Sequence, residues 1–177
     1  MYIPSQCPIK KDNHLAGPPN TEAESNMPAP AHVQAATLQR FLDAWKKWDA
    51  EEWLAVFADD FTQVTLPFGL GIPPRPRAQV EQVLPALVAT VKSYELTVHH
   101  VIHDVEKNKA AVYASSKGAL PWGPWELEYS VFITFSEAGD KVARLEEMMD
   151  SAFLRDFGPK FGQYLQAHGG PTAVAWQ

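Results

Sequence analysis

The chain has 177 residues, enough for one domain with a sizeable core, and its 46% of hydrophobic residues is an ordinary globular share. A formal net charge of −6 and the lack of a basic run argue against nucleic acid or an anionic membrane surface as a partner. Cys7 is the single cysteine, so no internal disulfide and no thiolate metal cluster can form.

The N-terminal segment is rich in proline and polar residues and shows no hydrophobic period. We therefore expect residues 1–31 to be a disordered extension, followed by one domain over residues 32–167 and a flexible tail over residues 168–177. The segment has no apolar stretch of the length that a secretory signal needs, and no run is long enough to span a membrane. We expect a cytoplasmic protein.

Three helices are predicted in the first half of the domain. VQAATLQRFLDAWKKWD carries apolar residues at helical spacing, and Asp49 then caps a second helix, AEEWLAVFADD, with acidic residues in its first turn. A short strand, FTQVTL, leads to a proline-rich loop. Pro76 can open a third helix, RAQVEQVLPALVATVKS, which Pro85 should kink or split.

From Tyr94 onward the hydrophobic period changes to two. Four consecutive strands are predicted, in YELTVHHVIHDV, KAAVYASS, WELEYSVFITF and KVARLEEMMDSAF, with a loop over residues 118–124. A last short helix should break at Gly158-Pro159. Helices followed by an antiparallel meander predict an α+β cone, in which a curved antiparallel sheet packs on three helices and encloses a pocket.

The order of these elements and the stretch FADDFTQVTLPFG resemble the fold family of nuclear transport factor 2, scytalone dehydratase, ketosteroid isomerase and the SnoaL-like polyketide cyclases, over residues 33–165. More narrowly, W-K-K-W-D-A-E-E-W, the L-P-F-G turn, the E-Y strand and R-L-E-E-M-M-D-S-A-F resemble SnoaL-like proteins of fungal biosynthetic gene clusters. The resemblance implies a cofactor-independent isomerase, cyclase or dehydratase acting on polyketides, meroterpenoids or indole alkaloids. It also implies a homodimer formed through the outer face of the sheet.

The resemblance to ketosteroid isomerase does not extend to its catalytic residues. Leu66 stands where that enzyme has an aspartate base, Phe41 where it has a tyrosine donor, and Val131 where it has a protonated aspartate. All three positions are apolar, so the steroid-isomerase mechanism is not available to this chain. Any proton transfer must come from other residues.

Two glutamates are the candidate acid–base groups. The alignment places Glu147 inward, between two apolar neighbours, where loss of hydration would raise the pKa of its carboxyl. The alternative is a buried ion pair with an arginine. In WELEYSVF the alignment favours Tyr129 inward and Glu128 outward, but a one-residue bulge would reverse them, so Glu128 remains a candidate beside the alternative of a cross-strand salt bridge.

Arg40 and Tyr113 are the candidates for stabilising a developing oxyanion. Arg40 precedes the pocket-facing Phe41, although it can equally pair on the surface with Asp43 or Glu81. Tyr113 is either a donor in an apolar cone or a core tyrosine. The full prediction is the catalytic set Arg40, Tyr113, Glu128 and Glu147, with the substrate-binding set Phe41, Trp45, Leu66, Phe68, His100, Ser115, Tyr129 and Met149.

We expect no metal, because the histidines His99, His100 and His103 have no carboxylate-rich or cysteine-containing partner motif. The resemblance to SnoaL-like proteins implies that no cofactor is needed. The sequence thus predicts an isomerase or cyclase that acts by general acid–base catalysis on a polycyclic secondary metabolite. Two alternatives stay open. One is a dehydratase in which a pocket histidine acts with tyrosines, and the other is a non-catalytic binding or dimerisation module.

Overall fold

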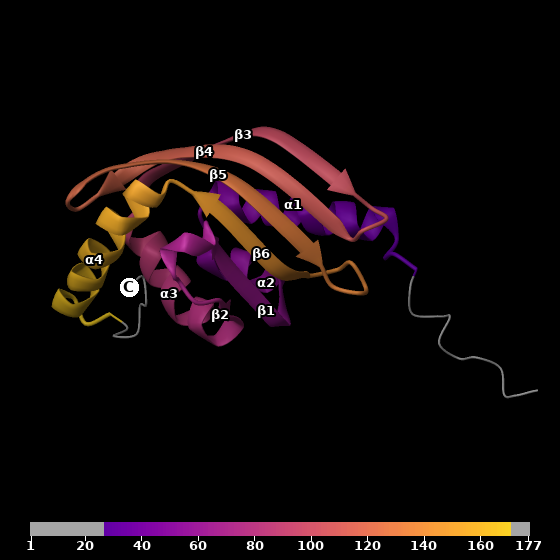
Figure 1. Ribbon diagram of the computed structural model, residues 1–177, viewed down its shortest axis with the longest axis horizontal. Coiled ribbons are helices and arrows are strands. Elements are labelled where there is room, and N and C mark those ends of the chain that lie inside the picture. Colours follow the sequence, from indigo (N-terminus) through magenta and orange to yellow (C-terminus); the bar gives the residue numbers. More distant parts are fainter. Residues whose placement is uncertain (1–26, 171–177) are drawn as a thin grey trace, which may run out of the picture.

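The computed structural model describes residues 27–170, which form a curved sheet with helices on its concave side (Figure 1). The greater part of the expected N-terminal extension and of the expected tail lies outside these residues, as does Cys7. The first helix starts at Ala31.

Residues 27–170 contain four α-helices and six strands. The helices and one 3₁₀ turn are α1 (Ala31–Lys47), α2 (Ala50–Val56), η2 (Phe68–Leu70), α3 (Arg77–Thr90) and α4 (Ser151–Ala167). The strands are β1 (Phe57–Leu66), β2 (Arg75–Pro76), β3 (Lys92–Asp104), β4 (Lys109–Leu120), β5 (Gly123–Phe135) and β6 (Val142–Met149).

The strands form one sheet in the order β2-β1-β6-β5-β4-β3. Neighbouring strands from β3 to β6 are antiparallel, as the predicted meander requires. The expected all-antiparallel sheet is corrected at one place, because β1 runs parallel to β6. The sheet arches over α1, α2 and α3 and stays unclosed, while α4 covers one end (Figure 1). The predicted α+β fold with a curved sheet is confirmed.

Helix α2 begins where the sequence predicts and ends earlier. The Asp49 side chain accepts a hydrogen bond from the Glu52 backbone N–H, which confirms the predicted cap. The helix stops at Val56, and the residues expected to continue it belong to β1. Phe57 instead pairs with Val142 of β6 and stacks on Phe61, with ring centroids 3.8 Å apart. Sheet pairing and core packing therefore override the helical pattern here.

Three other boundaries differ from expectation. Helices α3 and α4 run without a break through Pro85 and Pro159. In α4, Leu154 and Phe161 lie on opposite sides of the proline and are both buried, so packing offsets the lost backbone hydrogen bond. The expected loop over residues 118–124 is a tight hairpin, because β4 continues to Leu120 and β5 begins at Gly123.

The N-terminal end of α1 is fastened to the sheet by a buried amide. Gln34 is fully buried, and its Nε2 donates to the carbonyl of Ala29 at 2.7 Å and to Asn108 Oδ1 at 2.8 Å. Its Oε1 lies 3.0 Å from His103 Nε2. One side chain thus joins the helix to both ends of the turn between β3 and β4.

Candidate active site

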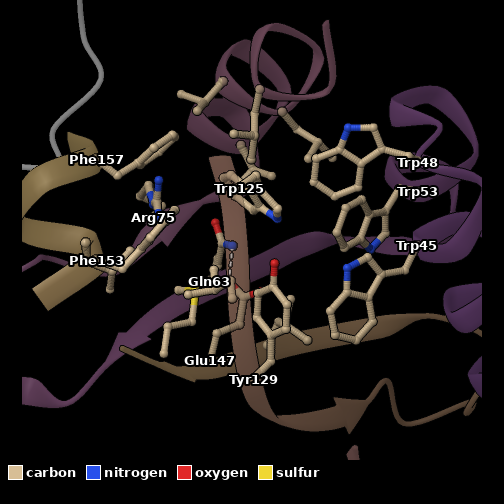
Figure 2. Close-up of a pocket in the computed structure, with 18 of the residues that line it drawn as sticks. Trp45, Trp48, Trp53, Gln63, Arg75, Trp125, Tyr129, Glu147, Phe153 and Phe157 are labelled. Atoms are coloured by element: carbon tan, nitrogen blue, oxygen red, sulfur yellow. Dashed lines mark hydrogen bonds between the residues drawn. The ribbon is translucent and has the colours of Figure 1, made fainter. Parts of the chain in front are cut away.

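A cavity lies between the concave face of the sheet and the helices, with an empty volume of about 720 Å³ including space open to solvent. Most of its lining is apolar and aromatic (Figure 2). The lining residues are Trp45, Trp48, Trp53, Phe57, Gln63, Arg75, Val80, Val83, Leu84, Leu87, Trp125, Leu127, Tyr129, Leu145, Glu147, Met149, Phe153, Leu154 and Phe157.

Three tryptophans from α1, α2 and the junction between them form one wall. Trp45 and Trp53 stack at 6.0 Å between ring centroids, and Trp48 tilts against Trp53 at 5.7 Å. Figure 2 shows this wall facing Phe153 and Phe157, which α4 supplies. Flat aromatic walls favour a flat ligand, because ring faces make extensive contact with little loss of side-chain freedom.

Glu147 lies in this cavity, as the alignment predicts. It sits on β6 opposite Val131 of β5 and Thr65 of β1, and it is 7% exposed. Gln63 on β1 donates a hydrogen bond from Nε2 to Glu147 Oε2. Figure 2 shows this hydrogen bond at the base of the cavity. The carboxyl is therefore held by a neutral donor within a largely apolar enclosure.

Arg75 is the charged partner of this carboxyl. It is 4% exposed, and its guanidinium donates to Thr65 Oγ1 at 3.2 Å. Thr65 is the residue that β1 places opposite Glu147, so the two charged side chains belong to one corner of the cavity. An arginine keeps its charge even when buried, so its field acts continuously on the carboxyl.

The environment changes the proton affinity of both groups. Burial raises the pKa of Glu147, while the hydrogen bond from Gln63 and the charge of Arg75 act in the opposite direction. Burial lowers the pKa of Arg75, and the charge of Glu147 opposes that change. A raised pKa brings a carboxyl closer to the neutral range, where general acid–base catalysis needs a group that both accepts and releases a proton.

A second polar group lies on the neighbouring strand. Tyr129 on β5 lines the cavity and packs edge-on against Trp45, with ring centroids 5.2 Å apart. Its hydroxyl lies 2.8 Å from Ser116 Oγ, which also accepts a hydrogen bond from Trp125 Nε1 at 2.7 Å. The predicted inward orientation of Tyr129 is confirmed, and no bulge interrupts its pairing with β4.

Four predicted site residues line the cavity, namely Trp45, Tyr129, Glu147 and Met149. The other predicted residues do not, and each is corrected below. Phe41 and Leu66 are buried, at 0% and 9% exposure, but belong to the core rather than the cavity lining. Phe68 is 76% exposed because the turn η2 carries it away from the core.

Arg40 is not in the cavity. Its guanidinium donates to Thr37 Oγ1 at 3.0 Å and to the backbone carbonyl of Asp140 at 2.6 Å, which ties α1 to the turn between β5 and β6. The alternative in which Arg40 pairs on the surface is therefore closer to the structure than a role in the pocket, although neither Asp43 nor Glu81 is its partner. Arg40 lies one residue from the buried Phe41, and one step along a helix turns a side chain away by about 100°.

Tyr113, Ser115, His100 and Glu128 lie on the outer face of the sheet. Tyr113 alternates with the buried Val112 and Ala114, so its ring points outward. Ser115 Oγ lies 2.8 Å from His99 Nε2, and His100 and Glu128 are exposed. Because these four residues do not line the cavity, we assign them no catalytic or substrate-binding role.

The sequence analysis missed Gln63, Arg75 and the contribution of α3 and α4 to the cavity. Gln63 and Thr65 both alternate with apolar residues of β1, and this alternation was the one available signal. Arg75 follows two prolines in a segment that resembles an exposed loop.

Among residues 27–170, no group of three or more metal-binding side chains is present, and no helix is long and apolar enough to cross a membrane.

A curved sheet over helices, with a mainly apolar cavity in its concave face, defines the nuclear transport factor 2-like class of proteins. The crystal structure of a steroid delta-isomerase from Pseudomonas aeruginosa has the same fold, with a TM-score of 0.59, 17% identity and coverage of 80% of this chain and 97% of that chain. A model of the SnoaL-like domain matches residues 38–145, and the chain belongs to this family.

Other similar proteins come from fungi. The BvnE pinacolase from Penicillium brevicompactum is similar in structure, with a TM-score of 0.67, 20% identity and coverage of 76% of this chain and 93% of that chain. A protein of Paecilomyces divaricatus called monooxygenase AgnL5 is 81% identical over 149 residues, which cover 84% of this chain and 92% of the relative. An ergochrome gene cluster protein of Claviceps purpurea is 44% identical and covers 84% of this chain and 97% of the relative.

Proposed function

We propose that the protein is a cofactor-independent isomerase or cyclase of fungal secondary metabolism, with Glu147 as its acid–base residue. The observation that carries the proposal is a buried carboxyl, with a raised pKa, in the wall of an aromatic cavity. The gene-cluster name of one relative supports a biosynthetic role. The aromatic walls support a flat polycyclic substrate.

The proposed reaction moves one proton. Glu147, ionised, removes a proton from a carbon next to a substrate carbonyl, and the electron pair of that C–H bond moves onto the carbonyl oxygen to give an enolate. The protonated Glu147 then returns the proton to another carbon. In a cyclisation the enolate carbon instead attacks a second carbonyl carbon of the same substrate, the π electron pair of that carbonyl moves onto its oxygen, and this oxygen takes the proton from Glu147. Gln63 and Arg75 hold the carboxyl and moderate its pKa, so it does not become too weak an acid to release the proton.

The dehydratase alternative receives less support. It requires a histidine in the pocket close to Tyr113, whereas His99, His100 and Tyr113 cluster on the outer face of the sheet, with the rings of His99 and Tyr113 4.8 Å apart. A monooxygenase is the second candidate, because the relative at 81% identity carries that name. Oxygen insertion would add one atom of dioxygen to the substrate and release the other as water, so it would need dioxygen, two protons and two electrons from a reductant.

Product analysis separates these functions. The purified full-length chain is added to an extract of a producing fungus from which its gene has been deleted, with E147Q protein as the control. We expect a compound whose retention time changes while its mass does not, and no change with E147Q. A loss of one water would assign a dehydratase, a gain of one oxygen atom would assign a monooxygenase, and either result would overturn the isomerase proposal.

We also propose that the chain forms a homodimer through the outer face of the sheet. Three large hydrophobic residues on adjacent strands, Tyr113, Phe132 and Met148, are 37%, 46% and 40% exposed. Tyr113 on β4, Phe132 on β5 and Met148 on β6 each alternate with buried residues, so they project from one surface. Exposed apolar patches of this kind mark interaction surfaces.

A further inference from the structure

We propose that the hydroxyl of Tyr129 is a hydrogen-bond donor aimed into the cavity, where it binds a carbonyl or enolate oxygen of the ligand. Ser116 and Trp125 hold it in the donating orientation. The role of Tyr129 in the reaction rests on the proposed function. Its role in binding a carbonyl oxygen does not. It narrows the ligand to a flat aromatic compound that carries a carbonyl oxygen.

The donor assignment follows from counting hydrogens. Trp125 Nε1, Ser116 Oγ and Tyr129 Oη together carry three donor hydrogens and make two contacts with one another. An indole nitrogen can only donate, so Ser116 accepts from Trp125. One hydrogen of the two hydroxyls is then left over, whichever way the contact between Ser116 and Tyr129 is oriented.

Burial decides which hydroxyl keeps the surplus hydrogen. Ser116 is 3% exposed and does not line the cavity, so a hydrogen that it did not donate to Tyr129 would remain buried without a partner. Leaving a buried donor unsatisfied is unfavourable, because the group loses its hydrogen bonds to water and gains none in return. The favoured chain therefore runs from Trp125 to Ser116 to Tyr129, and the remaining hydrogen belongs to the one hydroxyl of the three residues that borders the cavity.

A fourth hydroxyl leaves the count unchanged. Tyr94 stacks on Trp48 behind the cavity wall, and its hydroxyl is buried without a hydrogen bond among the described residues. Burial raises the pKa of Tyr94, and the Ser116 and Tyr129 hydroxyls are near enough to oppose that change. If Tyr94 turned toward Tyr129, it would add one hydrogen and one contact, so one hydrogen would still be left over. The Tyr94 hydroxyl is buried away from the cavity, so a hydrogen that it did not donate would have no partner, and donation from Tyr94 to Tyr129 again leaves the free hydrogen on Tyr129.

The phenol keeps its proton under working conditions. Burial raises the pKa of Tyr129 well above its usual value, and the nearby Tyr94 and Glu147 act in the same direction. A protonated phenol in a cavity of low polarity is an effective donor to an oxygen that gains negative charge. Tyr129 is paired with Met149, two residues from Glu147, so donor and carboxyl enter the cavity from adjacent strands.

Glu147 and Tyr129 can therefore act on neighbouring atoms of the same carbonyl compound. When Glu147 takes a proton from the carbon beside the carbonyl, the electron pair moves to the carbonyl oxygen, and the hydrogen bond from Tyr129 to that oxygen becomes stronger. The reacting oxygen faces Tyr129 and the reacting carbon faces Glu147. A flat hydrocarbon without oxygen would fill the same walls but leave the Tyr129 hydrogen unpaired.

The test uses 9-fluorenone and fluorene, which are flat tricyclic probes with and without a carbonyl. Equilibrium dialysis measures affinity, and infrared difference spectroscopy measures the carbonyl stretch of bound 9-fluorenone. We expect the full-length protein to shift that stretch to lower wavenumber than in cyclohexane. In Y129F the shift should vanish and the affinity for 9-fluorenone should fall about 2- to 10-fold, while fluorene binding stays unchanged.

Two further variants make the result specific. Y164F removes a phenol of α4 that does not line the cavity, and it should leave both readouts unchanged. S116A should keep or weaken the carbonyl shift, because Tyr129 loses the group that orients it. If Tyr129 instead donated to Ser116, S116A would free the phenol and increase the shift.

These measurements test the donor assignment without any need for the protein to convert a substrate. Failure of 9-fluorenone to bind, a carbonyl shift that survives in Y129F, or an increase in S116A would overturn the donor assignment. If Y129F did not fold, the sign of the S116A effect would still decide. A normal result here together with full activity of E147Q would refute the proposed function and leave the binding site intact.

Discussion

Gln63 donates its side-chain hydrogen bond to Glu147 across the one parallel strand pair of the sheet, between residues 84 positions apart in sequence. The contact joins an amide on β1 to the carboxyl on β6 at the base of the cavity. Through it, the first strand of the chain influences the proton affinity of a group on the last strand.

Removing this donor should move the pH dependence of activity. The hydrogen bond from Gln63 lowers the pKa of Glu147 by stabilising its ionised form. In Q63L the pKa should therefore rise, and the limb of kcat/KM that reports ionisation of the base should move to higher pH. Pre-steady-state or steady-state rates across a pH series measure this. T62V, on the neighbouring position of β1, is the control, and a Q63L profile identical to it would contradict the prediction.

Loss of the carboxyl itself should remove most of the activity. E147Q keeps the size and one acceptor oxygen of the side chain but cannot transfer a proton, so we expect turnover to fall about 10²- to 10⁴-fold. The matched control is E146Q, because Glu146 is the adjacent carboxyl and points away from the cavity. Single-turnover rates at saturating substrate measure the effect, and equal rates in the two variants would rule out the role of Glu147.

The same carboxyl should make stability depend on pH. Because burial raises the folded-state pKa of Glu147 above its ordinary value of 4.5, the unfolded chain ionises first as pH rises. The free energy of unfolding should fall as pH increases from 4.5 through the folded-state pKa, and E147Q should lack this part of the decline. Urea unfolding of both proteins over that range tests it. Parallel curves would show that Glu147 does not contribute.

The amide that fastens α1 should be costly to remove. In Q34L the Ala29 carbonyl, Asn108 and His103 all lose a partner, so we expect the free energy of unfolding to fall by about 1–3 kcal/mol or more. Q39L, on the exposed face of the same helix, should change it little. Chemical denaturation compares the two, and similar losses would argue that Gln34 is not the fastening residue.

Charge on the outer face should separate the proposed dimer. F132E places a carboxylate in the centre of the exposed apolar patch without touching the cavity, so we expect a monomer that still binds ligands in the cavity. Q163E, at an exposed position of α4 away from the outer face of the sheet, is the control. Sedimentation velocity measures the oligomeric state, and a wild-type monomer or an unaffected F132E dimer would refute this interface.

The sequence predicted side-chain direction best where strands are regular. Glu147 and Tyr129 were placed inward correctly, because the alignment to ketosteroid isomerase indicated the inner face and strand alternation then assigned each residue to a face. Tyr113 was misassigned for a different reason. On β4 both faces carry small or apolar residues, so the sequence does not show which face is buried. The structure shows that Val112 and Ala114, the neighbours of Tyr113, are on the buried face.

Contacts between distant segments could not be predicted. Gln63 and Arg75 reach Glu147 through the parallel register of β1 and β6 and through the two-residue strand β2, neither of which leaves a local pattern. Arg75 is buried although its proline-rich surroundings are typical of an exposed loop. Helices α3 and α4 form parts of the cavity wall because of the way they pack against the sheet. The hydrophobic period of a helix shows that it has an apolar face, but it does not show what that face packs against.

The parallel pairing of β1 with β6 also constrains the order of folding. A chain emerging from the ribosome exposes β1 while β6 remains unsynthesised, and the intervening hairpins can form from local contacts well before the two strands meet. Long-range pairing of this kind slows folding, because loop closure must precede the contacts that stabilise it. The cavity should thus be among the last features to assemble, and a nascent chain lacking its final strand should expose the surfaces that later bind ligand.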